Sequence, residues 1–208
     1  YTLILEEEKK NIHLQVGYLL LENIKAEELN DNLFYIVNQL NEGIDLIHER
    51  SRKEELARLN YQAGQKAKTS AAYEPALRYF EQALELLDLK SWQRDYEFTL
   101  KLYVETLEAL YLNTKFDRIE EFAKTILNET RGVLDTVKVY EIKILTYFAK
   151  FQQQKAIDTA IEILEELEVK ISKKIEEIDE RIIQEQEYLE LFLQKNNGDF
   201  YICTCPAD

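Results

Sequence analysis

The chain has 208 residues, of which 40 are acidic and 26 are basic, so its formal net charge at pH 7 is −14. This balance disfavours binding to nucleic acid and to anionic membranes, because both repel negative charge. No apolar run approaches the about 20 residues of a membrane-spanning helix, and the first residues lack the features of a signal peptide. We therefore expect a cytoplasmic protein.

Only five glycines and two prolines interrupt a chain rich in strong helix formers. Apolar residues recur at helical spacing almost throughout, as in the run that begins at Tyr96, Leu100 and Tyr103. Ser51 to Glu54 has the pattern of a capping box, and Pro75 suits a first helical turn. The expected helices cover residues 5–23, 27–41, 51–69, 73–88, 92–112, 116–129, 134–151, 153–167 and 171–195.

The third and fourth of these helices carry a spaced set of small and aromatic residues. Gly64, Ala76, Phe80 and Ala83 are separated by 12, 4 and 3 positions. Small residues allow two antiparallel helices to approach closely, and the aromatic ring fills the space beside them. This spacing is typical of a tetratricopeptide-like helix pair, so these four residues form a candidate helix-pair packing motif.

Later helix pairs repeat this pattern loosely. When the pairs are aligned by their turns, Ala76, Ile119 and Ala156 fall in equivalent places, at intervals of 43 and 37 residues. Because the connections are short, neighbouring helices should be antiparallel. The sequence therefore predicts an all-α fold, a tetratricopeptide-like α-solenoid of antiparallel helix pairs with a long C-terminal capping helix.

We expect three regions: helical repeats over residues 1–170, an acidic helix over 171–195, and a loosely ordered tail over 196–208. The acidic helix has near-heptad apolar spacing, which fits either a cap on the solenoid or the start of a coiled coil. Cys203 and Cys205, in the tail, have no histidine nearby and make neither a zinc site nor a disulfide framework. The sequence assigns them no role.

No catalytic, cofactor-binding or metal-binding residues are expected. Gly64-Gln65-Lys66 lacks the second glycine of a phosphate-binding loop and lies inside an expected helix. His13 has apolar neighbours, which favours a structural role, and His48 is expected to end a helix and help satisfy its last carbonyl groups. Acidic pairs such as Glu165 and Glu166 are expected by chance in a chain with 40 acids.

Aromatic residues are abundant, with 13 tyrosines and nine phenylalanines. Most should pack between helices, whereas one or two could face a partner across a concave surface. The candidate groove aromatics are Tyr61, Tyr73, Tyr79, Tyr96, Tyr103 and Tyr111.

Four stretches resemble the helical region of large bacterial signalling proteins that are common in cyanobacteria. They are HLQVGYLLLEN (13–23), IVNQLNEGIDLI (36–47), ELARLNYQAGQKAKTSAAYEPALRYFEQALELL (55–87) and SWQRDYEFTLKLYVETLEALYL (91–112). In that family a serine/threonine kinase domain and an AAA-type predicted ATPase precede the helical region, and sensory and histidine-kinase modules follow it. The resemblance places ATP-binding and phosphotransfer residues outside the helical region, so none is transferred to this chain.

The resemblance implies a non-catalytic scaffold that links the nucleotide-dependent module to sensory and output modules, so its partners would be neighbouring domains of the same polypeptide. A free-standing tetratricopeptide-type adaptor that binds peptides is the alternative, and an enzyme of unfamiliar kind is a third. A start codon directly before Tyr1 would favour the adaptor. The sequence leaves open the ligand, the oligomeric state, and whether the 171–195 helix dimerises.

Overall fold

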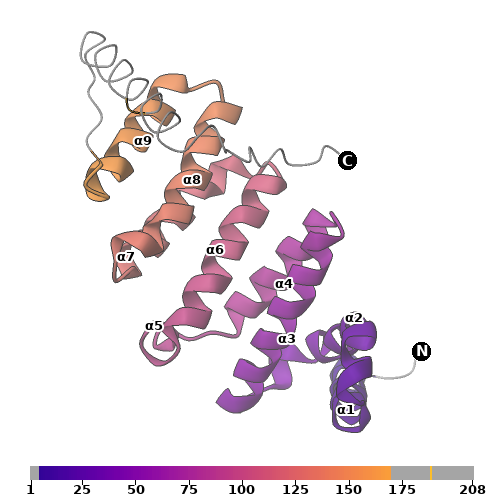
Figure 1. Ribbon diagram of the computed structural model, residues 1–208. Helices are drawn as coiled ribbons and strands as arrows, with labels where there is room; N and C mark the ends of the chain where they lie inside the picture. Colours follow the sequence, from indigo (N-terminus) through magenta and orange to yellow (C-terminus); the bar gives the residue numbers. More distant parts are fainter. Residues whose placement is uncertain (1–4, 170–187, 189–208) are drawn as a thin grey trace, which may run out of the picture. The chain divides into compact units, whose positions relative to one another are not determined.

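The computed structural model describes residues 5–169 and Tyr188, and within these residues it contains helices and turns but no strand (Figure 1). The prediction of an all-α chain is confirmed. By its contacts the chain divides into two units, Tyr1–Ile163 and Leu164–Asp208, and the description below concerns the first. The expected 171–195 helix and 196–208 tail lie outside the described residues, except that Tyr188 is helical.

Nine α-helices and one 3₁₀ helix lie within residues 5–169. They are α1 (Glu6–Asn23), α2 (Ala26–Glu42), η1 (Ile44–Leu46), α3 (Arg50–Thr69), α4 (Tyr73–Glu85), α5 (Ser91–Arg94), α6 (Tyr96–Leu112), α7 (Phe116–Glu129), α8 (Val133–Ala149) and α9 (Gln153–Glu166).

One expected helix start and one expected helix cap are wrong. The helix expected over 92–112 is broken at Asp95, whose backbone leaves the helical region and whose side chain accepts a hydrogen bond from the Phe98 amide at 3.3 Å. Asp95 is therefore the N-cap of α6. The expected capping box at Ser51 does not form, because α3 already begins at Arg50, and Glu49, its N-cap, makes no side-chain cap.

The same turn joins three successive helix pairs. In each turn one residue adopts the left-handed conformation: Ala71 between α3 and α4, Thr114 between α6 and α7, and Phe151 between α8 and α9, with φ of 56°, 55° and 57°. The amide of the next residue donates to the carbonyl five positions earlier, at 2.9, 2.9 and 2.8 Å. These are Schellman turns, and each following helix starts two residues after the left-handed residue.

Several helices adjacent in sequence pack against each other, and successive helix pairs also contact one another. Helix α3 packs on α4, α4 on α6, and α6 on both α7 and α8, while α2 joins the first pair to α3. Figure 1 shows α3, α4, α6 and α8 lying side by side as rods. The fully buried residues lie at these contacts, including Ile36, Phe80, Leu107 and Ile126.

All four residues of the packing motif are buried between α3 and α4. A Cβ atom at Gly64 would lie only 2.4 Å from Cε1 of Phe80, so glycine is what allows the Phe80 ring to lie against the α3 backbone. Ala76 and Ala83 are both fully shielded from solvent on the same helix as Phe80. The two helices meet through small residues on either side of one aromatic ring.

Candidate interaction surface

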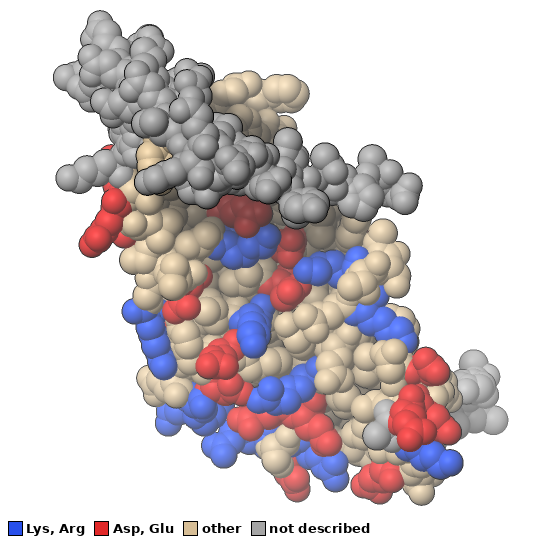
Figure 2. All heavy atoms as spheres, viewed as in Figure 1, with Lys and Arg blue, Asp and Glu red and all other residues tan. Residues whose placement is uncertain are grey.

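Side-chain pairs tie α3, α6 and α8 together. Lys68 Nζ on α3 lies 2.5 Å from Glu105 Oε2 and 2.8 Å from Glu108 Oε2 on α6. The other oxygen of Glu108 lies 3.6 Å from Lys138 Nζ on α8. A chain of alternating charge therefore runs across the three helices, and Figure 2 shows acidic and basic side chains interspersed on the face in view. We call the sides of α3, α6 and α8 that carry or adjoin these residues the ladder face.

Partial burial makes these ion pairs stronger than isolated surface pairs. Burial alone would lower the pKa of Lys68, but its hydrogen bonds to Glu105 and Glu108 outweigh that effect and raise the pKa above its usual value. For Glu108, burial acts to raise the pKa, and the two lysines outweigh it and lower the pKa. Both groups are therefore held in their charged forms at neutral pH.

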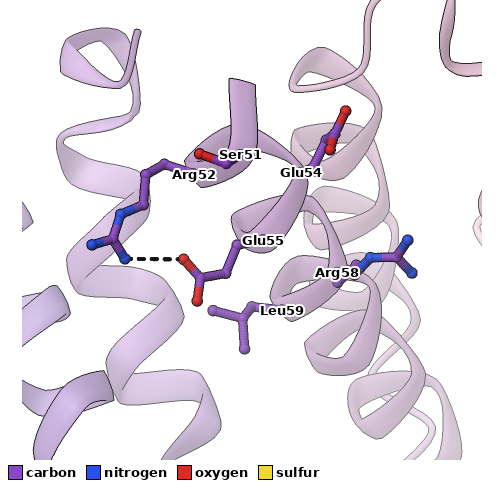
Figure 3. Close-up of a pocket in the computed structure, with 6 residues that line it drawn as sticks. All are labelled: Ser51, Arg52, Glu54, Glu55, Arg58 and Leu59. Atoms are coloured by element: carbon purple, nitrogen blue, oxygen red, sulfur yellow. Dashed lines mark hydrogen bonds and ion pairs between the residues drawn. The ribbon is translucent and has the colours of Figure 1, made fainter. Parts of the chain in front are cut away.

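The first half of α3 borders a shallow, charged hollow of about 580 Å³ (Figure 3). Its lining residues are Ser51, Arg52, Glu54, Glu55, Arg58 and Leu59. The Arg52 guanidinium donates to Glu55 at 3.1 Å and lies over the Tyr18 ring, 4.5 Å from its centroid. Figure 3 shows Arg58 pointing away from this pair, and its guanidinium forms an ion pair with Asp95.

Both arginines of this hollow are therefore engaged by carboxylates and aromatic rings, which leaves neither free to bind an anion. The hollow also contains no histidine or cysteine that could activate Ser51. In the part of the chain that is described, no group of three or more histidine, cysteine or acidic residues is placed to hold a metal ion.

A stripe of apolar side chains is exposed along α8. Leu134 and Val137 lie near the start of the helix and Leu145 and Phe148 near its end, with the exposed Glu141 between the two groups; Leu134 and Phe148 are 80% and 52% exposed. Lys138, which is paired with Glu108, lies next to Val137, so this stripe borders the ladder face. Exposed large apolar side chains grouped in this way are typical of interaction sites.

The six candidate groove tyrosines are spread over α3, α4 and α6. Tyr61 lies half-buried, with its ring 6.0 Å from that of Phe80 and 5.5 Å from that of Phe98. Tyr79 stacks on Phe34 at 5.7 Å, and its hydroxyl donates to Asn38 at 2.9 Å. Tyr61 therefore links α3 to α4 and α6, and Tyr79 links α4 to α2.

Tyr96 links α6 to the start of α8. Its hydroxyl donates to Asp135 and accepts a hydrogen bond from the Arg131 amide at 3.0 Å. The Arg131 guanidinium lies over the Tyr96 ring, 4.1 Å from the centroid, and also donates to the Trp92 carbonyl at 3.0 Å. Burial and the bond to Asp135 raise the pKa of Tyr96 above its usual value.

The remaining three tyrosines differ in exposure. The Tyr103 ring lies between those of Trp92 and Phe122, at 4.9 and 5.4 Å, and Tyr111 packs against the first residue of α7. Tyr73, in contrast, is exposed at the start of α4. Most of the six tyrosines thus connect helices, and their contribution to a groove remains a proposal.

A buried cluster of side-chain amides, which the sequence does not predict, joins α2, α3 and α4. Asn60 on α3 is fully buried, and it exchanges hydrogen bonds of 2.8 Å with Asn41 on α2. Asn41 also donates to Gln82 on α4 at 2.7 Å. The three amides join three helices, and Asn60 was overlooked because asparagine within a helix usually faces solvent.

The two histidines lie in different surroundings. His13 on α1 lies half-buried with its Nδ1 2.7 Å from Gln39 Oε1 on α2, so it joins the first helix pair. The expectation that His48 ends a helix is wrong, because η1 ends at Leu46 and His48 is exposed in the link that follows. Neither lies beside a serine or cysteine in any of these contacts.

No helix within the described residues is long and apolar enough to cross a membrane. No protein-family model matches the chain, and no solved structure matches it. The chain is similar to "Hybrid signal transduction histidine kinase G" of Dictyostelium discoideum, with 25% identity over 184 residues. The match covers 77% of this chain but only 5% of that protein. This similarity indicates a relationship to signalling proteins.

Proposed function

We propose that this chain is a non-catalytic tetratricopeptide-like α-solenoid, the interaction segment of a multidomain signal-transduction ATPase/kinase in the cytoplasm. Its role would be to hold the nucleotide-dependent module against sensory and output modules. The observation that carries this proposal is the Schellman turn that recurs at Ala71, Thr114 and Phe151. Three helix pairs joined by one turn geometry and stacked in order are what a solenoid requires.

Interactions between successive repeats support the same proposal. Lys68 to Glu105, Arg118 to Glu81 and Tyr96 to Asp135 join residues 37, 37 and 39 positions apart. Each pair joins a helix of one pair to a helix of the next: α3 to α6, α4 to α7, and α6 to α8. Such contacts between successive pairs would make the array stiff, and a stiff surface loses little entropy when a partner binds.

The ladder face is the proposed binding surface, with the apolar stripe of α8 as its anchor. Leu145 and Phe148 would pack against apolar groups of a partner. The relative from Dictyostelium is a histidine kinase by name, which supports a signalling context for the whole protein. The catalytic residues of such a protein would lie in its other modules.

A site-specific photo-crosslinker tests this proposal in the full-length protein. Placed at Leu145 on α8, it should capture a nucleotide-dependent or sensory module of the same polypeptide. The matched control position is Glu121, which is exposed on α7. Equal capture from both positions, or no capture from Leu145, would refute the docking role of the ladder face.

The exposed stripe on α8 also suits a free-standing adaptor that binds peptides. Crosslinks from Leu145 to a separate polypeptide would favour that alternative. Turnover of ATP by the isolated chain, measured as phosphate release, would overturn the non-catalytic assignment.

A further inference from the structure

Helix α1 carries apolar residues on two opposite faces. One face packs on α2 through Gly17, where a Cβ atom would lie 2.6 Å from Cδ2 of Leu40. The other face exposes Leu5, Ile12 and Leu19 at intervals of seven residues, and Ile12 and Leu19 are 48% and 62% exposed. A spacing of seven places Ile12 and Leu19 on one line along α1, and Leu5 is the N-cap residue directly before the helix.

Within the described residues α1 contacts α2 and η1, and these contacts leave the side chains of Ile12 and Leu19 exposed.

A groove lies beside the exposed apolar residues of α1. It has a volume of about 570 Å³ and lies between the end of α1 and the first half of α2. Its apolar lining includes Leu19, Leu20 and Ile24 from the α1 side, and Tyr35 and Ile36 from α2. Tyr35 is 55% exposed, so a ring and an aliphatic side chain face solvent together here.

Two unpaired carboxylates lie along this surface. Glu28 lines the groove from the first turn of α2, where Lys25 is the N-cap, and Glu8 lies further along α1, beside the apolar line and away from the groove. Neither carboxylate forms an ion pair within residues 5–169, whereas the neighbouring lysines Lys9 and Lys10 are paired with Glu6 and Asp45. The surface therefore offers one unpaired carboxylate at the groove and a second one along α1.

We propose that this surface, formed by Leu5, Ile12, Leu19 and the adjoining α1–α2 groove, docks a basic amphipathic helix of another protein. Apolar residues of that helix at heptad spacing pack along α1, and its lysine or arginine side chains pair with Glu8 and Glu28. A second copy of this chain is the wrong occupant, because its net charge of −14 would bring acidic surfaces together. The surface is distinct from the ladder face.

The test measures binding of a synthetic three-heptad peptide of about 21 residues, with leucine at the two seam positions and lysine or arginine beside them. The comparison peptide replaces every basic residue with glutamate. We expect the basic peptide to bind and the acidic one to bind at least about tenfold more weakly, by fluorescence anisotropy at low salt.

Variants locate the site. Ile12→Asp and Leu19→Asp should each weaken binding of the basic peptide by about tenfold or more, since a carboxylate would be buried against leucine. Their circular dichroism and melting temperature should stay unchanged, because both side chains are exposed. Leu89→Asp, at a 96% exposed position between α4 and α5, is the matched control and should bind as the unmodified chain does.

Charge reversal distinguishes the proposed site from non-specific hydrophobic binding of the peptide. Glu8→Lys combined with Glu28→Lys should weaken the basic peptide and strengthen the acidic one. Equal binding of both peptides, or binding that Leu19→Asp leaves unchanged, would overturn the proposal. So would sedimentation showing dimers that Leu19→Asp abolishes, or photo-crosslinks from position 19 to the same polypeptide in the full-length protein.

Discussion

Substitution of Gly64 by alanine tests the packing of α3 on α4. The added methyl carbon would lie 2.4, 2.6 and 2.9 Å from three carbon atoms of the Phe80 ring. Carbon atoms in contact normally lie about 3.5–4.0 Å apart, so the two helices or the ring must move by more than 1 Å. Phe80 is fully buried, which leaves its ring no free space.

The expected effect is the difference of two terms. Overpacking a well-filled core costs about 1–3 kcal/mol, and the rigid ring places this site near the upper end. Alanine in place of glycine within a helix contributes about 1 kcal/mol in the opposite direction. We expect Gly64→Ala to lower the free energy of unfolding by about 2 kcal/mol, and the melting temperature by about 4–8 °C for a chain of this size.

Urea denaturation followed by circular dichroism measures this change. Gly132→Ser is the control, because a Cβ atom there meets nothing within 4 Å and serine is a good N-cap for α8. Phe80→Leu should remove most of the penalty of Gly64→Ala, so the double-mutant cycle should show coupling above about 1 kcal/mol. A Gly64→Ala protein as stable as the unmodified chain would refute this account of the helix contact.

Three further predictions concern a turn and two titrating side chains. Phe151→Gly should stabilise the chain by about 0.5–1 kcal/mol in urea denaturation, because φ is 57° there; Lys150→Gly, where φ is −90°, should not stabilise it. Burial and a hydrogen bond to a nearby carboxylate raise the pKa of Tyr147 from 10.0 to about 12, so the folded state keeps a proton that the unfolded state loses. The stability advantage of the unmodified chain over Tyr147→Phe should thus be complete below pH 10 and disappear between pH 10 and 12, and a constant difference would contradict this. The lowered pKa of Glu108 has the opposite sign: its contribution is present above the usual value of 4.5 and is lost as pH falls below it, so Glu108→Gln and the unmodified chain should converge in acid-unfolding curves. A gap that persists in acid would contradict the ion-pair assignment.

The sequence by itself determined the helices and the register between them. Helix ends were predicted to within a few residues over most of the described chain, because apolar periodicity and short connections act locally. Aligning the pairs by their turns placed Ala76, Ile119 and Ala156 in equivalent positions, and all three have zero exposure. Each is the fourth residue of its helix, so the alignment made from the sequence matches the register in the structure.

Local patterns failed where a distant residue decides the conformation or the role. The break at Asp95 is stabilised by its own cap and by an ion pair with Arg58, which lies 37 residues earlier. The sequence does not mark the left-handed residues, because alanine, threonine and phenylalanine occupy a position that usually requires glycine. Sequence spacing located these turns without revealing their geometry.

Tertiary structure alone decided how each helix pair fills its interface. Counting by the turn register, the positions of Gly64 and Phe80 correspond to Leu107 and Ala123 in the next pair, and all four are buried. The large residue lies on the second helix in one pair and on the first helix in the other. Close packing constrains the combined volume of the two side chains at such a contact, but either helix can supply the larger one. A sequence motif defined by one residue type at each position therefore looks imperfect in a pair whose contact is filled equally well.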